Sequence, residues 1–150
     1  MEEQDRVAVV QQFGRTYRAF MSAFELHVGH PMPRWRILLA LHEQEGESSQ
    51  KRLVERLRID PGALTRQLKT LEQMGWIERS MDTRDNRVTN VKLTDTGREQ
   101  TEASLPARNA FLHDTMAALP DDALAALSGA LGLLEARIGE VAAAAPQPAG

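Results

Sequence analysis

Hydrophobic side chains near the start of the chain recur every three or four positions, which is the period of one face of an α-helix. Across residues 5–28 this spacing is followed by Val10, Phe13, Tyr17, Phe20 and Phe24. Pro31 and Pro33 end this first helix because proline cannot continue a helix interior. A second helix is predicted over residues 34–43, and a loop over residues 45–48.

The middle of the chain predicts two more helices, a short one over residues 49–57 and a longer one that starts at Pro61. Asp60 is a favourable N-cap for the longer helix, and proline is favoured at its first position. The helix is expected to end near Gly75, since glycine readily adopts the left-handed conformation found after a helix.

Alternating apolar and polar residues then predict two strands, over residues 76–79 and 88–93, joined by a polar tip into a hairpin. A fifth helix is predicted to reach about Leu119, with a kink or an interruption at Pro106. A sixth helix is predicted over residues 121–141, and the uncharged segment 142–150 is expected to fray. The fold class is therefore mainly α with a small β-hairpin (α+β).

Composition narrows the class of protein. The chain has no cysteine, which excludes disulfides, thiolate nucleophiles and cysteine-ligated zinc. No apolar run approaches the roughly 18 residues that a membrane span needs. The first residues lack the basic start and apolar run of a signal peptide. We therefore expect a soluble, cytoplasmic protein.

The charge is distributed unevenly along the chain. The net charge is −3, yet residues 51–92 carry ten basic and six acidic side chains, a local net charge of +4. A basic centre in an otherwise acidic chain is typical of a local polyanion-binding surface.

The helix that begins at Pro61 has the pattern of a DNA-recognition helix. Leu64, Leu68 and Leu71 share one face, while small, polar and basic residues share the opposite face: Gly62, Arg66, Lys69 and Gln73, flanked by Thr65 and Thr70. Arg66 can reach guanine in the major groove, and Lys69 is better placed for a phosphate. An ordinary surface helix would show the same pattern, so the neighbouring sequence has to decide between the two interpretations.

That sequence contains four motifs in a consistent order and spacing. They are Leu64-Thr65-Arg66, Leu71-Glu72-Gln73-Met74-Gly75-Trp76-Ile77-Glu78-Arg79, Asp82-x-Arg84-Asp85-x-Arg87 and Leu93-Thr94-x-x-Gly97. Through them the chain resembles the MarR family of bacterial transcription regulators. The resemblance implies a winged helix-turn-helix DNA-binding lobe over residues 34–94. Residues 5–33 and 95–141 would then form a helical dimerisation region.

The resemblance also implies where DNA is contacted. In the family, the β-hairpin is called the wing, and an arginine at its tip enters the minor groove. We assign this role to Arg84, with Arg87 as the second choice. Asp82 and Asp85 can pair with these arginines and stiffen the tip; a surface salt-bridge cluster is the alternative reading. The expected DNA-binding residues are Ser49, Gln50, Gly62, Ala63, Thr65, Arg66, Lys69, Arg84 and Arg87.

The sixth predicted helix carries apolar residues at alternating spacings of three and four, the pattern of a helix–helix seam. A single winged lobe does not need this stripe and the similar one on the first helix, so we expect a homodimer, although packing within one chain is the alternative. The expected interface residues are Val10, Phe13, Leu124, Leu127, Leu131, Leu134 and Ile138. A two-fold dimer predicts a palindromic operator, and repression is the commoner outcome in the family.

Family members commonly release DNA when a small anionic aromatic compound binds near the junction of the two regions. The junction of this chain offers cationic and aromatic side chains that suit an aromatic carboxylate. The candidate ligand-binding residues are Arg15, Tyr17, Arg18, His27, Met32, Arg34 and Trp35, with His30 beside them. For each residue taken singly, a place in the core or on the surface is the alternative.

Other functions find little support in the sequence. His27 and His30 could supply two metal ligands, but the break at Pro31 makes their geometry uncertain, so we expect no metal site and no cofactor. The sequence has no glycine-rich phosphate loop, nucleophile elbow or zinc-protease motif, so we expect no enzyme. A helical protein-interaction module would explain the apolar seams but not the basic wing.

Overall fold

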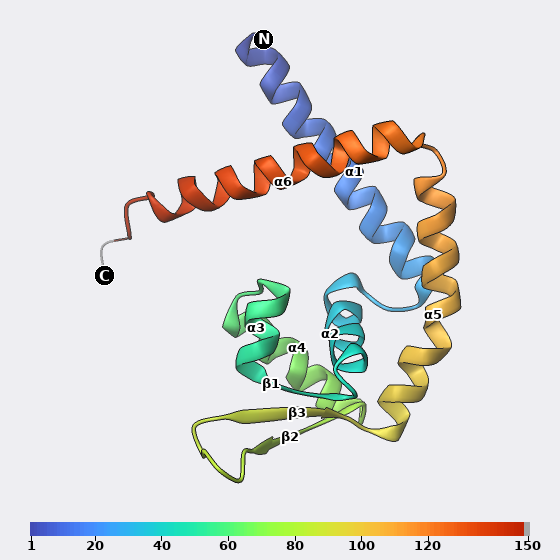
Figure 1. Cartoon of the computed structure of the whole chain (residues 1–150), viewed down its shortest axis with the longest axis vertical. Helices are drawn as coiled ribbons and strands as arrows, with labels where there is room; N and C mark the ends of the chain where they lie inside the picture. Colours follow the sequence, from blue (N-terminus) through green and yellow to red (C-terminus); the bar gives the residue numbers. More distant parts are fainter. Residues whose placement is uncertain (149–150) are drawn as a thin grey trace. The chain divides into compact units, whose positions relative to one another are not determined.

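The computed structural model describes residues 1–148 and divides into two compact units, Met1–Phe111 and the residues from Leu112 onward. Figure 1 shows its helices and strands. They are α1 (Glu3–Val28), α2 (Met32–Glu43), β1 (Glu47–Ser49), α3 (Gln50–Leu57), α4 (Pro61–Gln73), β2 (Ile77–Met81), β3 (Thr89–Leu93), α5 (Asp95–Met116) and α6 (Asp121–Ala143). The expected fold class, mainly helical with a small β element, is confirmed.

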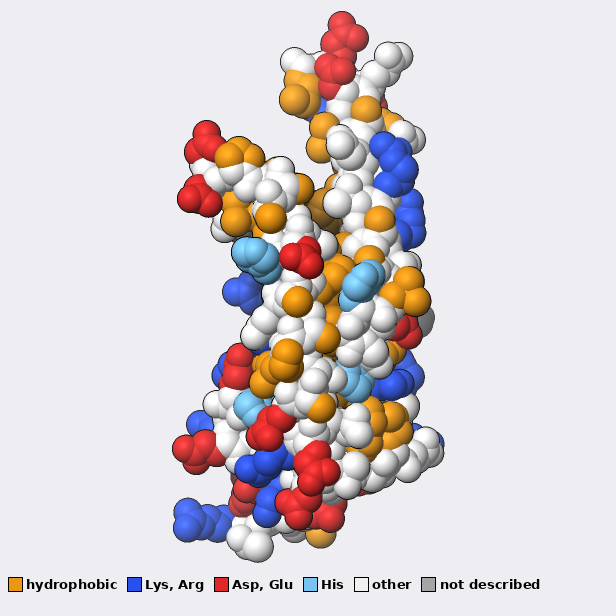
Figure 2. Space-filling view, turned by 90° about the vertical axis from the view of Figure 1, so that its right-hand side faces the viewer, with side chains coloured by type: hydrophobic (Ala, Val, Ile, Leu, Met, Phe, Trp, Pro, Cys, Tyr) orange, Lys and Arg blue, Asp and Glu red, His pale blue; other side chains and the backbone are white. Residues whose placement is uncertain are grey.

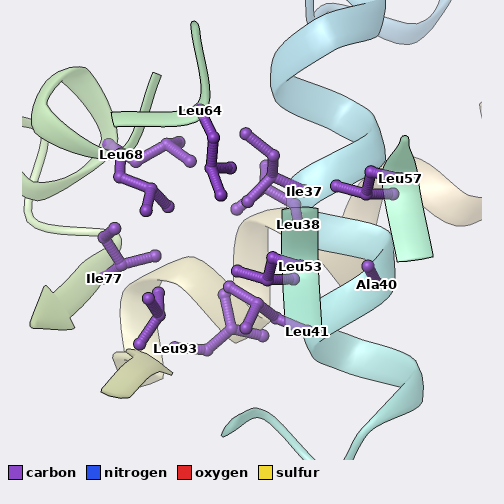
Figure 3. Packing of buried hydrophobic residues seen from close by; sticks show 12 residues of the cluster. Ile37, Leu38, Ala40, Leu41, Leu53, Leu57, Leu64, Leu68, Ile77 and Leu93 are labelled. Atoms are coloured by element: carbon purple, nitrogen blue, oxygen red, sulfur yellow. The ribbon is translucent and has the colours of Figure 1, made fainter. Parts of the chain in front are cut away.

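One aliphatic cluster joins α2, α3, α4 and the sheet. Figure 3 shows side chains from these elements pointing toward one another. The cluster consists of Ile37, Leu38, Ala40, Leu41, Leu53, Leu57, Leu64, Leu68, Leu71, Ile77, Val91 and Leu93. Burying each leucine contributes roughly 1.5–3 kcal/mol relative to leaving it in water. The cluster thereby fixes the orientation of α4 relative to the sheet.

The sheet has three antiparallel strands in the order β1-β3-β2. Ile77 of β2 lies opposite Leu93 of β3, and Ser48 of β1 lies opposite Val91 on the other edge of β3. The predicted loop over residues 45–48 is therefore partly wrong, because Glu47–Ser49 is a strand. It has three polar residues and no apolar alternation, so its pairing depends on β3, which is distant in the sequence.

The predicted boundaries of α4 are confirmed. The Asp60 carboxylate accepts a hydrogen bond from the backbone N–H of Ala63 at 3.0 Å, and Pro61 occupies the first helical position. Gly75 follows the helix with a φ of 76°, the left-handed conformation that a glycine adopts without steric cost. These local signals fix where the helix begins and where the chain turns toward β2.

Pro106 does not interrupt α5, which runs without a break from Asp95 to Met116. A proline removes one backbone hydrogen bond, here the one to the carbonyl of Glu102. Both Pro106 and Glu102 are exposed, so water can serve that carbonyl. α5 ends earlier than Leu119, and α6 extends to Ala143, into the expected tail. Residues 149–150 of that tail lie outside the described residues.

Aromatic side chains attach α5 to the second half of α1. The Phe111 ring lies 5.4 Å from the Phe20 ring and 5.6 Å from the Phe24 ring, measured between centroids. His27 also contacts Phe111, at 5.6 Å. The first half of α1 has no such cover within its unit, and Figure 2 shows hydrophobic side chains on its surface.

Among residues 1–148, no single helix combines the length and apolar composition of a membrane span, and α5 and α6 meet that test only when taken as a joined pair.

Candidate nucleic-acid interface

α4 buries one face and exposes the other. Leu64, Leu68 and Leu71 are 0% exposed. The face turned to solvent carries Gly62, Thr65, Arg66, Lys69 and Gln73, whereas Ala63 and Thr70 are half-buried. A methyl group added to Gly62 would lie 3.6 Å from Nη1 of Arg66, so this guanidinium folds back toward the start of the helix. The predicted orientation of α4 is confirmed.

The start of α3 is hydrogen-bonded to the exposed face of α4. The Gln50 amide nitrogen donates to the Thr65 hydroxyl at 3.1 Å, and that hydroxyl donates to the Pro61 carbonyl at 2.9 Å. Ser49 caps α3 by accepting a hydrogen bond from the Arg52 N–H at 3.1 Å. The hydrogen bond between Gln50 and Thr65 therefore connects the N-terminus of α3 to the first turns of α4.

The tip of the wing, residues 82–88, is ordered by one carboxylate. Asp82 accepts hydrogen bonds from the backbone N–H groups of Arg84 and Asp85, at 3.0 and 3.1 Å, and from the Asn90 side chain at 2.9 Å. The Asn90 bond and the two backbone bonds hold the pKa of Asp82 below its usual range. Asp82 therefore stays ionised at neutral pH, and its hydrogen bonds hold the loop in one conformation.

The two arginines of the wing differ in their surroundings. Arg87 forms a two-point ion pair with Asp85, at 3.0 and 3.1 Å, which lowers the pKa of Asp85. Asp82 binds the backbone of Arg84, not its guanidinium, so the expected pairing of both aspartates with both arginine side chains is wrong for Asp82. Within residues 1–148 the Arg84 side chain has no ion-pair partner, and it is exposed.

Most of the basic side chains between residues 51 and 92 are available to a partner. Ion pairs hold Arg56 to Glu43, Arg79 to Glu72 and Arg87 to Asp85. Within the described part of the chain, no ion pair is found for Lys51, Arg52, Arg66, Lys69, Arg84 and Lys92. Figure 2 shows a basic side chain projecting at the sheet-bearing end of the first unit.

A surface hollow of about 430 Å³ lies between the helices and the wing. Its lining comes from the starts of α3 and α4 and from the end of the wing: Ser49, Gln50, Lys51, Val54, Pro61, Arg87, Val88 and Thr89. Ser49, Gln50 and Arg87 are residues that the sequence predicted to contact DNA. Gly62, Thr65, Arg66 and Lys69 are exposed on α4 beside it, and Arg84 is exposed at the wing tip.

The predicted dimer residues form apolar surface on each unit. On α1, Val10 is 69% exposed and Phe13 is 52% exposed, with Tyr17 stacked on Phe13. On α6, Leu124 is half-buried, and the remaining seam residues are exposed: Leu127, Leu131, Leu134 and Ile138. No residue of α6 is classed as buried.

The candidate ligand residues are dispersed between surface and core. Arg15, Tyr17, Arg18 and His27 are exposed on α1, whereas Met32 and Arg34 are half-buried at the start of α2. Trp35 is buried, with its ring stacked 5.7 Å from the buried His30.

One arginine at the start of α2 and one on α5 each have a buried guanidinium nitrogen. Nε of Arg34 and Nε of Arg108 are buried without a hydrogen-bond partner within the described chain. They belong to the same region, because His30 beside Arg34 bonds Ser104, one helical turn before Arg108, at 2.8 Å. Arg108 was not predicted from the sequence, since no pattern in residues 95–116 separates it from other basic residues.

The two histidines considered as metal ligands have other partners. Nδ1 of His27 bonds the Ala23 carbonyl at 2.8 Å, while Nε2 of His30 bonds Ser104. Burial, and then the positive charge of Arg34, hold the pKa of His30 below its usual value. Residues 1–148 contain no group of three or more histidine or carboxylate side chains able to hold a metal.

The chain is similar to one family model and to several known proteins. A sequence model of the MarR family matches residues 31–89, from the start of α2 to the start of β3. Residues 31–89 therefore resemble a MarR-family domain. A relative from Bacillus subtilis (strain 168), named as the uncharacterized HTH-type transcriptional regulator YdgJ, is 38% identical over 94 residues, covering 63% of this chain and 57% of the relative. The chain spans about half the length of the curated relatives it matches.

Solved structures agree in fold. The transcriptional regulator RdhR-CbdbA1625, crystallised with 2,4-dichlorophenol, superposes with a TM-score of 0.82 at 18% identity, covering 91% of this chain and 82% of its own. AbfR, crystallised in an overoxidized form bound to DNA, gives a TM-score of 0.70 at 28% identity, covering 89% and 96%. The MarR-family match and the regulator names of the relatives agree with the expectation that this chain is not an enzyme.

Proposed function

We propose that this protein is a transcription regulator that binds double-stranded DNA in a sequence-specific manner, acts in the cytoplasm and works as a repressor. The observation that carries the proposal is the exposed face of α4. It presents Gly62, Thr65, Arg66 and Lys69 while its leucines are buried. A recognition helix needs such a face, because its first turns must approach base edges closely and without bulk.

The polar residues around α4 supply the other contacts. Lys51 and the capped N-terminus of α3 suit a phosphate, since a helix N-terminus carries partial positive charge. Ser49, Gln50 and Ala63 line the approach to the base edges. Arg84, on a wing tip held rigid by Asp82, suits the minor groove, and Arg87 beside it suits a phosphate. The structural neighbour AbfR, which was crystallised bound to DNA, supports DNA as the partner.

The DNA-binding form is proposed to be a homodimer. The exposed apolar surfaces of α1 and α6, which include Phe13 and Leu131, need a partner because surfaces of this kind are costly in water. A two-fold dimer presents two copies of α4 to successive major grooves, about 34–36 Å apart. The operator is therefore a palindrome.

A DNA-binding assay on the purified protein tests this function. Random duplex DNA is taken through repeated rounds of binding and amplification, and the selected DNA is footprinted. The proposal expects two protected half-sites related by symmetry and a steep loss of affinity with added salt, because phosphate contacts release counterions. Binding without sequence preference, or without symmetry, contradicts it.

An aromatic acid is proposed to release the DNA. Arg34, whose Nε is unpartnered, is next to Trp35 in the sequence, and Arg108, whose Nε is also unpartnered, lies one helical turn after Ser104, which bonds His30. Cationic side chains beside the stacked rings of His30 and Trp35 suit a ligand with an anionic end and a flat ring. The structural neighbour crystallised with 2,4-dichlorophenol supports a ligand of this kind. Such a ligand must bind the DNA-incompetent form more tightly, since equal affinity for both forms shifts nothing.

Titration calorimetry with benzoate and with 2,4-dichlorophenol tests the ligand proposal. Arg34→Ala and Arg108→Ala are each expected to weaken binding at least fivefold. Arg98→Ala, at an exposed arginine in the first turn of α5, serves as the control and leaves binding unchanged. Equal binding by all three variants removes this junction as the ligand site.

A further inference from the structure

The hydroxyl of Thr65 has a single proton, and the structure shows where it goes. The hydroxyl donates to the Pro61 carbonyl, which can only accept a hydrogen bond. Thr65 must therefore accept at its second contact, so the group of Gln50 that faces it must be the NH₂. The orientation of the Gln50 amide is fixed by these two hydrogen bonds.

The fixed orientation leaves a defined set of groups free. The Oε1 atom of Gln50 and its second N–H have no hydrogen-bond partner within residues 1–148. Oε1 is also not among the buried atoms that lack a partner, so it is open to solvent. The hydroxyl of the exposed Thr65 has donated its proton and can no longer donate to a base, so the γ-methyl is the apolar group that this side chain offers.

This pair of groups matches one base pair better than the others. A glutamine amide that offers an oxygen and an N–H side by side binds adenine, accepting from N6 and donating to N7. A methyl group beside it makes apolar contact with the C5-methyl of thymine. Guanine presents two acceptors in the major groove and would face the Gln50 oxygen with an unfavourable acceptor.

We propose that Gln50 and Thr65 together read an A·T pair in each half-site, Gln50 binding the adenine and the Thr65 methyl contacting a thymine beside it. The hydrogen bond between them holds the glutamine in place before DNA arrives, which lowers the entropy lost on binding. The inference rests on the proposed function, because it assumes that this face of α4 meets the major groove. It assigns Thr65 a methyl contact in place of a polar one.

The test uses the DNA sequence selected by the wild-type protein and measures affinity by fluorescence anisotropy. Each A·T pair of the half-site is changed in turn to G·C. The wild type is expected to lose roughly 5- to 150-fold in affinity at the position that Gln50 reads. Gln50→Ala reduces that loss to less than twofold and leaves the other positions unchanged. Gln50→Glu moves the preference toward cytosine, whose N4 group donates to a carboxylate.

Thr65 is tested by separating its two groups. Thr65→Ser keeps the hydroxyl and removes the methyl, so it should abolish the affinity lost when deoxyuridine replaces thymidine. Thr65→Val keeps the methyl and removes the acceptor that positions Gln50. It should therefore retain the loss with deoxyuridine and weaken the preference for adenine. Circular dichroism and the melting temperature confirm that each variant is folded.

The outcomes separate the inference from the function on which it depends. If the wild type selects a palindrome but Gln50→Ala and Gln50→Glu keep every base preference, the reading by Gln50 is wrong and the regulator function stands. If Thr65→Ser remains as sensitive to deoxyuridine as the wild type, the methyl contact is wrong. A wild type that selects no sequence overturns the proposed function and this inference with it.

Discussion

The carbonyl oxygen of Trp76 occupies the space that a side chain at Gly97 would need: a Cβ there would lie 2.0 Å from it. Thr94 adds two hydrogen bonds at the same point, donating from its hydroxyl to the Gly75 carbonyl at 2.7 Å and accepting from the Gly97 N–H at 3.1 Å. The Thr94-x-x-Gly97 motif therefore joins the start of α5 to the turn between α4 and β2, and so couples α4 to α5.

Gly97→Ala is expected to destabilise the protein. The added methyl group meets backbone, which cannot move aside as a flexible side chain can, and overpacking of this kind costs about 1–3 kcal/mol or more. Urea unfolding at fixed protein concentration measures the loss. As a control, Gly129→Ala adds a methyl group in α6 where no atom lies within 4 Å, and it should not destabilise the chain. If the Gly97 variant and the wild type are equally stable, the backbone can make room for the methyl group without loss of stability, and the prediction is wrong.

Arg84 and Arg87 are expected to differ in their effect on DNA affinity. Arg84 is exposed without an ion pair, so Arg84→Ala removes a cation that is ready to bind and lowers the affinity most for narrow, A·T-rich minor grooves. Arg87 already forms an ion pair with Asp85, so Arg87→Ala should lower the DNA affinity less than Arg84→Ala does. Anisotropy on duplexes with A·T-rich and G·C-rich flanks measures both effects. A larger loss with Arg87→Ala would reverse the assignment.

The wing tip should loosen when Asp82 is removed or protonated. Asp82→Ala deletes the acceptor of three hydrogen bonds, so the backbone amides of Arg84 and Asp85 should exchange with deuterium several times faster. The lowered pKa of Asp82 means that its contribution is present above the ordinary aspartate range and is lost as the pH falls through the folded-state value. Unchanged exchange in the variant would mean that other contacts hold the tip.

His30 is expected to make the protein less stable in mild acid. It is buried against Trp35 and Trp76, and its pKa is lowered by burial and then by Arg34. In the unfolded chain His30 therefore becomes protonated near pH 6.5, whereas in the folded chain it stays neutral until the pH is lower. The free energy of unfolding falls as the pH drops below 6.5. Melting temperatures between pH 7.5 and 5 should fall less steeply for His30→Gln than for the wild type. Equal slopes would exclude His30 as the source.

The parts of this structure that follow from local rules are the parts that the sequence predicts. The leucines at 64, 68 and 71 and the cap at Asp60 depend on spacing and on neighbouring backbone, so α4 and its exposed face were predictable. β1 depends on pairing with a strand far along the chain, and the role of Arg108 depends on which buried groups lack partners. Neither leaves a local pattern. An interruption of α5 at Pro106 was also possible from the sequence, and it is absent because solvent can compensate for a proline on an exposed face.

The central claim is that the exposed face of α4 reads DNA, and paired substitutions on that face test it most directly. Affinity for the selected palindrome and for unrelated duplexes is measured over a series of salt concentrations. Arg66→Ala should cost about 1–3 kcal/mol on the palindrome and relax the base preference. Lys69→Ala should weaken all duplexes alike and reduce the salt slope by about one, while Arg98→Ala changes neither. If Arg66→Ala and Lys69→Ala both bind the palindrome as the wild type does, α4 is not the DNA-reading element.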